Sequence, residues 1–143
     1  MKNVLVLCTG NSCRSQMAHG FLNYYSGGTA NIYSAGIETH GLNPRAVSTL
    51  AEVGIDIANH TSNLVDEYIS IDFDFIITVC DHAQEHCPVF HSKNAVRLHQ
   101  NFEDPSKISG SEEAVLAAFR KTRQAIDDFC KAFAKEHLNP LPG

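Results

Sequence analysis

Short apolar runs alternate with helical patterns along the chain. Uninterrupted or nearly uninterrupted apolar stretches predict strands over residues 4–7, 31–37, 73–79 and 95–98. A helix is predicted after the first strand, ending at Gly27, and a second one begins with Asn43 as its N-cap. A short helix is expected over residues 62–69, and Ser111 is expected to cap the longest helix. The apolar stripe of that last helix comprises Val115, Phe119, Thr122, Ile126, Phe129 and Phe133.

This alternation predicts an α/β fold, with a parallel sheet covered by helices on both faces in a single domain over residues 1–143. Ligands of such sheets bind beyond the carboxyl ends of the strands. Cys8 ends the first predicted strand, Cys80 ends the third, and Asp104 lies just past the fourth. We therefore expect two cysteines and a carboxylate at one rim of the sheet.

The composition excludes some classes of binding partner and indicates where the protein works. The net charge of −5 argues against nucleic acid or an anionic membrane as the main partner. The apolar runs fall far short of the ~20 residues of a membrane span, and the first one is too short for a secretory signal. We expect a cytoplasmic monomer, in which five cysteines indicate catalysis or redox chemistry rather than structural bridges.

The strongest candidate site runs from Cys8 to Ser15. Five residues separate Cys8 from Arg14, so the chain between them must curl. Gly10 permits a positive φ there, and Asn11 tolerates left-handed geometry better than most residues. Curled backbone N–H groups and the start of the next helix bind anions, and Arg14 fits a tetrahedral oxyanion. This field should lower the pKa of Cys8, whose thiolate would be the nucleophile. The expected oxyanion-binding residues are Thr9, Gly10, Asn11, Ser12, Cys13 and Arg14.

A second cluster spans Cys80 to Pro88, with the sequence CDHAQEHCP. In a helix, Cys80 and Cys87 would have Cα atoms ~10 Å apart, whereas a disulfide needs them within ~7 Å. The two cysteines could bond only if the segment unwinds. We interpret it as a redox-driven order-to-disorder switch.

Other interpretations of this cluster stay open. Cys80 and Cys87 could be unrelated core cysteines. They could join His82 and His86 around a zinc ion, although the spacing is not a standard zinc pattern and we expect no metal. They could also hold trivalent arsenic or another soft ion, as a sensor would.

The Cys8 loop resembles the phosphate-binding loop of the low-molecular-weight protein tyrosine phosphatase family. That resemblance implies a nucleophilic Cys8, an anion-clamping Arg14 and a Ser15 hydroxyl that supports the thiolate. It also implies a three-layer fold with strand order 2-1-3-4. Together with Cys80, Cys87 and Asp104-Pro105, the chain resembles the thioredoxin-linked arsenate reductases built on this fold. The motifs CTGNSCRSQMA and TVCD-x5-CP carry the match, which covers nearly the whole chain.

This second resemblance implies a relay of three cysteines that serves arsenic detoxification. Cys8 attacks arsenate, and Asp104 donates a proton to the leaving oxygen. Cys80 then attacks Cys8 and releases arsenite, and Cys87 attacks Cys80 to free Cys8. Thioredoxin or a similar dithiol would reduce the final disulfide.

The resemblance also raises the question of a potassium ion. Some thioredoxin-linked relatives bind potassium through a loop Asn, an acid on the first helix, a Ser on the second strand and a later Asp. Asn11 and Ser34 match this set, whereas His19 and Asn63 replace the two carboxylates. We therefore expect no tightly bound cofactor and activity that is insensitive to potassium.

Two other functions compete with arsenate reduction. A tyrosine phosphatase would need only Cys8, Arg14 and Asp104, and a weak phosphatase side activity is expected. Against it, Ser106 stands where phosphatases of this fold offer an aromatic residue, and the cysteine pair would be idle. A non-catalytic arsenite or redox sensor could use the same three cysteines.

Overall fold

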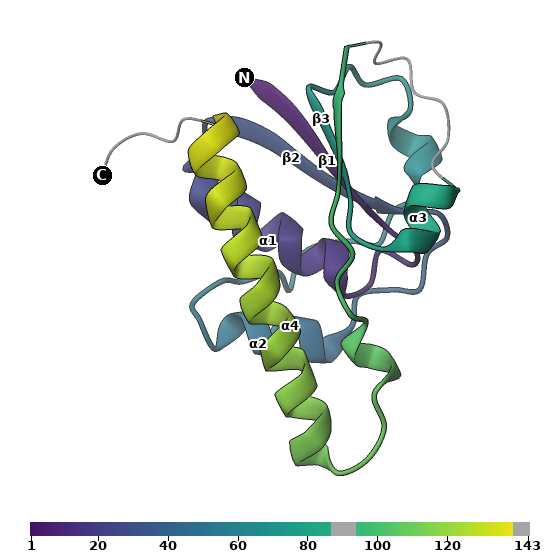
Figure 1. Cartoon of the computed structure of the whole chain (residues 1–143), viewed down its shortest axis with the longest axis vertical. Helices are drawn as coiled ribbons and strands as arrows, with labels where there is room; N and C mark the ends of the chain where they lie inside the picture. The colour runs from purple at the N-terminus through teal and green to yellow at the C-terminus, as the bar shows by residue number, and fades with distance from the viewer. Residues whose placement is uncertain (87–93, 139–143) are drawn as a thin grey trace.

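The computed structural model describes residues 1–86 and 94–138. Within them, the strands are β1 (Lys2–Cys8), β2 (Ala30–Gly36), β3 (Phe75–Thr78) and β4 (Val96–His99). They form one parallel sheet in the order β2-β1-β3-β4, which confirms the expected fold and strand order. The strand that carries Cys8 therefore lies beside the strand that leads to Cys80, as Figure 1 shows.

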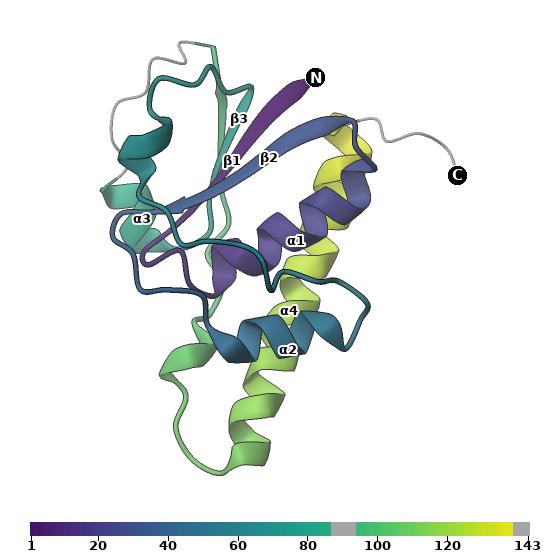
Figure 2. The same ribbon diagram turned by 180° about the vertical axis from the view of Figure 1, so that it is seen from behind.

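Helices cover both faces of the sheet. The α-helices are α1 (Arg14–Ser26), α2 (Pro44–Ala51), α3 (Asp81–Glu85) and α4 (Glu112–Phe133). Short 3₁₀ turns occur at η1 (Val65–Tyr68) and η2 (Pro105–Lys107), and α4 continues into a π-helical turn, η3 (Ala134–Leu138). The long α1 and α4 lie on one face, while α3 and η1 lie on the other (Figures 1 and 2). Within the described ranges, no helix combines the length and the apolar character needed to cross a membrane.

The predicted helix ends are confirmed. Asn43 caps α2, because its side chain accepts the N–H groups of Arg45 and Ala46. Ser111 caps α4 through the N–H of Ala114, and Gly27 ends α1 in the left-handed region at φ 56°.

The short helix expected over residues 62–69 is only the single 3₁₀ turn η1. The Glu67 carboxylate accepts the N–H of Leu64 at 2.9 Å and so closes this turn on itself. The next residues return to β3 instead of extending the helix.

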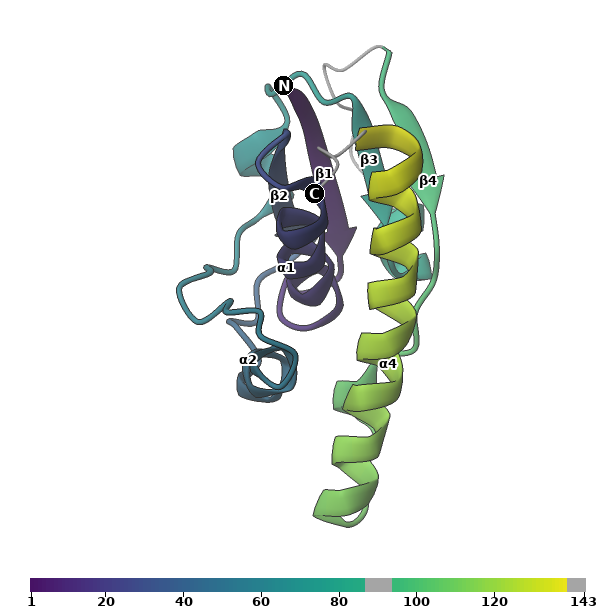
Figure 3. The ribbon, with the colours of Figure 1, turned by 90° about the vertical axis from the view of Figure 1, so that its left-hand side faces the viewer.

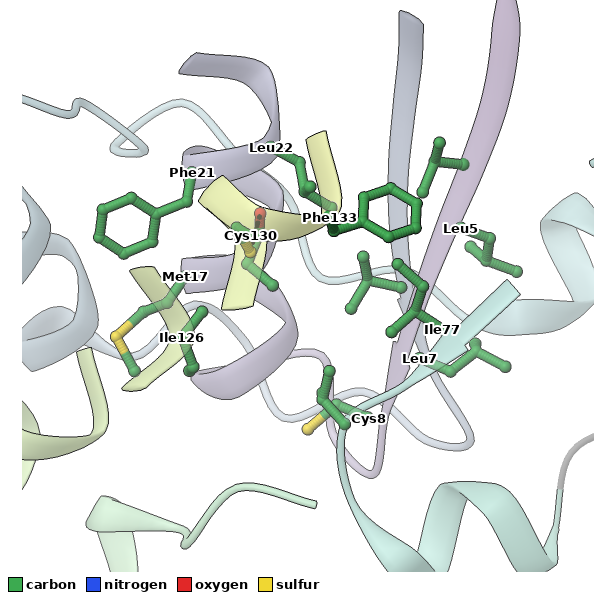
Figure 4. Close-up of a cluster of buried hydrophobic side chains, with 14 of the residues drawn as sticks. Leu5, Leu7, Cys8, Met17, Phe21, Leu22, Ile77, Ile126, Cys130 and Phe133 are labelled. Atoms are coloured by element: carbon green, nitrogen blue, oxygen red, sulfur yellow. Dashed lines mark hydrogen bonds between the residues drawn. The ribbon is translucent and has the colours of Figure 1, made fainter. Parts of the chain in front are cut away.

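The core lies between the sheet and the helix pair α1 and α4, which run side by side in Figure 3. Residues Val4 to Leu7 of β1 are fully buried, because helices cover both faces of this central strand. Within the predicted α4 stripe, Val115 and Phe129 are only partly buried. Cys8 lies at the edge of the cluster drawn in Figure 4. The core therefore fixes β1 and leaves its last residue at the rim.

Candidate active site

The carboxyl ends of β1 and β3 bring Cys8 and Cys80 together. The Val79 N–H donates to the Leu7 carbonyl at 2.9 Å, which keeps the two chains paired up to the cysteines. The thiols of Cys8 and Cys80 hydrogen-bond to one another, and each residue is only 3 % exposed. Thr9, the residue after Cys8, places its hydroxyl 3.3 Å from the Cys80 sulfur. The expected juxtaposition of the two cysteines is thus present in the structure.

Asn11 gives the loop between Cys8 and Arg14 its curl. It has φ 47°, in the left-handed region that asparagine tolerates, and its side chain is fully buried. Its Nδ2 donates to the Ser15 hydroxyl at 2.8 Å, and its Oδ1 accepts the N–H of Asn63 at 2.8 Å. These bonds hold an otherwise unfavourable backbone conformation in place.

Gly10 is needed for another reason than the one expected. Its φ lies outside the left-handed region, so the loop does not use the positive φ that a glycine permits. A Cβ at this position would lie 2.3 Å from Nδ1 of His40, too close for any side chain. Gly10 therefore makes room for an imidazole that packs directly on the loop.

A cavity of about 240 Å³ opens above the loop. A single water occupies about 30 Å³ of liquid, so a tetrahedral oxyanion and several waters fit inside. Of the expected oxyanion-binding residues, Asn11 alone does not line it, because its side chain is engaged behind the loop. The lining residues are Cys8, Thr9, Gly10, Ser12, Cys13, Arg14, His40, Asp104, Ser106 and Lys107.

Arg14 reaches this cavity from the start of α1. Its Nη1 donates to the Phe102 carbonyl at 3.0 Å, and its Nη2 lies 3.5 Å from Asp104 Oδ2. Its Nε is buried and has no hydrogen-bond partner within the described part of the chain. A buried guanidinium N–H without a partner, beside a cavity that ends at a cysteine, is what an anion would complete.

Asp104 closes the cavity opposite the loop. Its Oδ1 accepts the backbone N–H of Ser106 at 3.0 Å and the Ser106 hydroxyl at 2.6 Å. Among the residues that the structure describes, its Oδ2 has only the long contact with Arg14. One carboxylate oxygen is thus fixed and the other is available to a ligand. The role of Asp104 as proton donor stays a prediction.

The pKa values of the cysteine pair differ from the expectation: Cys80, and not Cys8, has the lowered pKa. Hydrogen bonding to Cys80, followed by burial, raises the pKa of Cys8, while Arg14 and the Ser15 N–H act against this rise. The pKa of Cys80 falls to about 5, chiefly because it accepts a hydrogen bond from Cys8 and further ones from Thr9 and Ala83. The lowered pKa predicted for Cys8 is therefore found at Cys80 instead, because Cys80 accepts the hydrogen bond between the two sulfurs.

Ser15 contacts Cys8 through its backbone. Its N–H is hydrogen-bonded to the Cys8 sulfur, while its hydroxyl accepts from Asn11. Support of the thiolate by the Ser15 hydroxyl stays a prediction.

The other described cysteines are placed less favourably for chemistry. Burial raises the pKa of Cys13 to about 12, so Cys13 stays a thiol and contributes to the loop through its position. Cys130 is fully buried in the core, and its thiol donates to the Ala18 carbonyl at 3.7 Å.

Cys80 also begins α3. Its sulfur accepts the N–H of Ala83 at 3.4 Å, so the sulfur is the N-cap of this five-residue helix. Asp81 ties the same turn to β4 through its contact with His99 Nε2 at 2.7 Å. The helix expected here is present over Asp81–Glu85, whereas Cys87 and Pro88 lie outside the described residues.

The zinc interpretation gains no support from the residues in view. The rings of His82 and His86 stack at 4.2 Å, and His82 Nδ1 lies 3.3 Å from the Thr9 hydroxyl. In the part of the chain that the structure describes, no group of three or more His, Cys, Asp or Glu side chains could hold a metal ion.

Side chains behind the loop occupy the region of the suspected potassium site. His19 Nδ1 lies 2.8 Å from the Ser34 hydroxyl, and its ring packs 4.4 Å from that of His60. His60 Nδ1 lies 3.1 Å from Gln16 Oε1, and Gln16 Nε2 donates to the Asn11 carbonyl at 3.1 Å. A neutral hydrogen-bonded chain thus supports the loop from behind.

This arrangement predicts a loss of stability in mild acid. Burial, and next the neighbouring His60, lower the pKa of His19 from 6.5 to about 4. The unfolded chain therefore binds a proton below pH 6.5 that the folded chain refuses until about pH 4. Between pH 7 and pH 4, His19 should remove about 3 kcal/mol from the free energy of unfolding. Urea unfolding of the wild type and of His19→Asn at both pH values measures this difference, and equal pH slopes in the two proteins would contradict it.

Sequence and structure comparisons relate the chain to known proteins. Residues 3–140 match the family model described as low molecular weight phosphotyrosine protein phosphatase. An arsenate reductase of Bacillus subtilis is 46 % identical over 134 residues, covering 94 % of this chain and 96 % of that protein. The arsenate reductase of Halalkalibacterium halodurans gives the same figures. Arsenate reductase 1 of Staphylococcus saprophyticus is 49 % identical over 125 residues, 87 % of this chain and 90 % of its own.

Solved structures agree with these relatives. An arsenate reductase in its oxidized state superposes with a TM-score of 0.82 at 29 % identity, covering 95 % of this chain and 98 % of the other. An arsenate reductase in a phosphate-binding state superposes with a TM-score of 0.77 at 30 % identity and the same coverage.

Proposed function

The chain belongs to the low molecular weight phosphotyrosine protein phosphatase family, and we propose that its reaction is the reduction of arsenate to arsenite. One observation carries this proposal: Cys8 lines a cavity suited to an oxyanion, and its thiol is hydrogen-bonded to a second thiol, that of Cys80, directly behind it. Hydrolysis of a phosphate ester requires one nucleophilic sulfur, whereas reduction requires two sulfurs that can bond to each other. The names of the relatives that are about 46 % identical support the same choice.

Binding uses the loop and Arg14. Arsenate has the shape and charge of phosphate, so the loop N–H groups and the unpartnered Nε of Arg14 would surround its oxygens. The positive end of α1, which begins at Arg14, adds to this field.

In the first chemical step, Cys8 attacks arsenic. The shared proton moves to Cys80, and the Cys8 thiolate forms a sulfur–arsenic bond. An arsenate hydroxyl, protonated by Asp104, leaves as water. Arg14 stabilises the charge that develops on the remaining oxygens.

In the second step, Cys80 acts as the nucleophile. It first loses its proton, for which Thr9 offers a route: the Thr9 hydroxyl lies 3.3 Å from both the Cys80 sulfur and Nδ1 of the exposed His82. The Cys80 thiolate then attacks the Cys8 sulfur. A sulfur–sulfur bond forms, the sulfur–arsenic bond breaks, and its electron pair stays on arsenic, which leaves as arsenite.

In the third step, Cys87 regenerates Cys8. The Cys87 thiolate attacks the Cys80 sulfur, so that a Cys80–Cys87 disulfide replaces the Cys8–Cys80 disulfide. A thioredoxin-type dithiol then reduces this disulfide and supplies the two electrons consumed in each cycle. α3 has to open for this step, because a helical Cys80–Cys87 spacing of ~10 Å exceeds disulfide reach.

A tyrosine phosphatase is the second candidate, since Cys8, Arg14 and Asp104 would serve it equally well. Ser106 and Lys107 at the cavity argue for a small inorganic anion, because neither offers an aromatic surface for a tyrosyl ring. A weak phosphatase side activity remains part of the proposal.

The test is arsenate-dependent consumption of reducing equivalents in the presence of thioredoxin and its reductase. The wild type should turn over continuously, whereas Cys87→Ser should release about one arsenite per chain and then stop, because its Cys8–Cys80 disulfide cannot be resolved. Cys130→Ser is the matched control, since this core cysteine has no part in the relay. Continuous turnover by Cys87→Ser would contradict the third step, and steady aryl phosphate hydrolysis without arsenate turnover would favour the phosphatase.

A further inference from the structure

His99 connects the sheet to the first turn of α3. It is the last residue of β4, and Thr78, the last residue of β3, lies opposite it in the parallel register. The Thr78 hydroxyl lies 2.7 Å from Nδ1 of His99, and Nε2 of the same ring lies 2.7 Å from Oδ1 of Asp81. Asp81 is the first residue of α3 and directly follows Cys80. One imidazole ring therefore joins the ends of two strands to the residue beside the second sulfur of the site.

These two hydrogen bonds do not depend on the charge of the imidazole. A carboxylate only accepts, so Nε2 of His99 donates to Asp81 in both protonation states of the ring. In the neutral ring, Nδ1 accepts from the Thr78 hydroxyl. In the charged ring, Nδ1 donates to the same oxygen, and the Thr78 hydroxyl can turn to the Leu98 carbonyl at 3.4 Å. The connection from Thr78 to Asp81 is therefore complete in either state.

The backbone on both sides of Cys80 is held by the segment that follows β4. The Asp81 N–H donates to Oδ1 of Asn101 at 3.0 Å. The Phe102 N–H donates to the Val79 carbonyl at 3.0 Å, so the two chains stay paired beyond the ends of their strands. Together with the imidazole bond, these contacts fix the position from which the Cys80 side chain projects.

The far end of α3 is bonded in another way. Gln84 and His86 are exposed, and their N–H groups donate within the helical turn, to the carbonyls of Cys80 and His82 at 3.2 and 3.1 Å. Hydrogen bonds of this kind are lost when a short helix unwinds, whereas the bonds from Asp81 to the segment at β4 can persist. An opening of α3 should therefore begin at its C-terminal end and leave its first residue in place.

We propose that His99 is a positioning residue that keeps the Cys80 sulfur beside Cys8 while the rest of α3 opens. This inference deepens the proposed function and rests on it. In that reaction, Cys80 first attacks Cys8 and then has to stay in place while Cys87 attacks it. Both steps need a fixed Cys80 backbone, although the helix that begins there has to unwind. A connection at the first turn meets both needs, since it does not restrain the end of the helix that moves.

The test measures how readily Cys8 and Cys80 form a disulfide in the absence of arsenate. Protein carrying Cys87→Ser is equilibrated with reduced and oxidised glutathione at one fixed pH. Each protein disulfide that forms from two thiols converts one oxidised glutathione to two reduced molecules. The equilibrium constant is the effective concentration of one protein thiol at the other, which reports their relative position. Peptide mass spectrometry identifies the Cys8–Cys80 disulfide.

His99→Phe keeps the size of the ring and removes both of its hydrogen bonds, so the effective concentration should fall about tenfold. Asp81→Ala should lower it about fivefold, because it removes one of these bonds. Asp81→Asn should keep it within about twofold, since the amide oxygen still accepts from Nε2 of the ring. The two Asp81 variants lose the same charge, so their difference isolates the hydrogen bond.

Asp128→Ala is the matched control. It removes a carboxylate that accepts from Gln124 Nε2 at 2.9 Å on the exposed surface of α4. The effective concentration should be unchanged in this variant. The dissociation constant of inorganic phosphate should stay within about twofold in every variant, because the anion loop and Arg14 are not altered. A loss confined to the disulfide equilibrium separates positioning from a general disturbance of the site.

Two results would overturn the inference: an unchanged effective concentration in either His99→Phe or Asp81→Ala, or an equal fall in Asp81→Ala and Asp81→Asn. Urea unfolding of the reduced proteins shows whether each variant is folded, and the exposed Asp81 variants decide the question if His99→Phe is not. If the effective concentration depends on His99 but arsenate is not reduced, the reductase proposal fails and the positioning role stands. If arsenate is reduced and the effective concentration does not change, only the positioning role fails.

Discussion

Cys8→Ser is expected to reduce arsenate turnover at least about 10³-fold, because a serine hydroxyl neither forms the sulfur–arsenic bond nor accepts a disulfide. The substitution removes a single side-chain sulfur that is 3 % exposed, so the fold should persist. The measurement is arsenite release in a single turnover, with excess dithiol, for the wild type and the variant. Circular dichroism and the unfolding midpoint establish that both proteins are folded.

Cys130→Ser is the matched control for this experiment. The serine hydroxyl can keep the hydrogen bond to the Ala18 carbonyl. The substitution should therefore change only the free energy of unfolding, and arsenate turnover should stay within about twofold. Arsenite release by Cys8→Ser at the wild-type rate would place the nucleophile elsewhere and contradict the proposed first step.

Arg14→Lys is expected to lower kcat/KM for arsenate by about 10²–10³-fold, although the charge is kept. Lysine cannot present the planar donor group, and it leaves the Phe102 carbonyl and the cavity oxyanion to a single ammonium. The dissociation constant of inorganic phosphate should rise along with the loss in kcat/KM.

Arg45→Lys provides the comparison at an exposed site. Arg45 pairs with Glu112 on the surface, so the same chemical change should leave kcat/KM within about twofold. A comparable loss in both variants would show that Arg14 acts through stability and not through the oxyanion.

The local features of the fold are predictable from sequence because each depends on neighbouring residues. The buried run of β1, the Asn43 and Ser111 caps and the Gly27 terminus all appear where the pattern predicts them. The meeting of Cys8 and Cys80 follows from the strand order, which the family resemblance supplied.

The features that sequence missed depend on contacts between distant segments. The reason for Gly10 is an imidazole thirty positions away, and the low pKa of Cys80 depends on a thiol donor from another strand. No pattern in the sequence marks His40, although it lines the cavity, because histidines follow no periodic pattern. Its position does indicate that it lies near the site, since His40 follows a strand that ends at the same rim of the sheet as Cys8.

Because Cys80 lies at the start of α3, the redox state of its sulfur affects the stability of this helix. Its sulfur is the acceptor that caps the helix, and a cap of this kind contributes about 0.5–2 kcal/mol. Once that sulfur bonds to Cys8, its lone pairs are drawn towards the new partner and away from the Ala83 N–H. A five-residue helix has little cooperativity with which to survive this loss. In the proposed relay, oxidation and unwinding would therefore proceed as one event, and the segment would open only in a molecule that has already reacted and carries a disulfide.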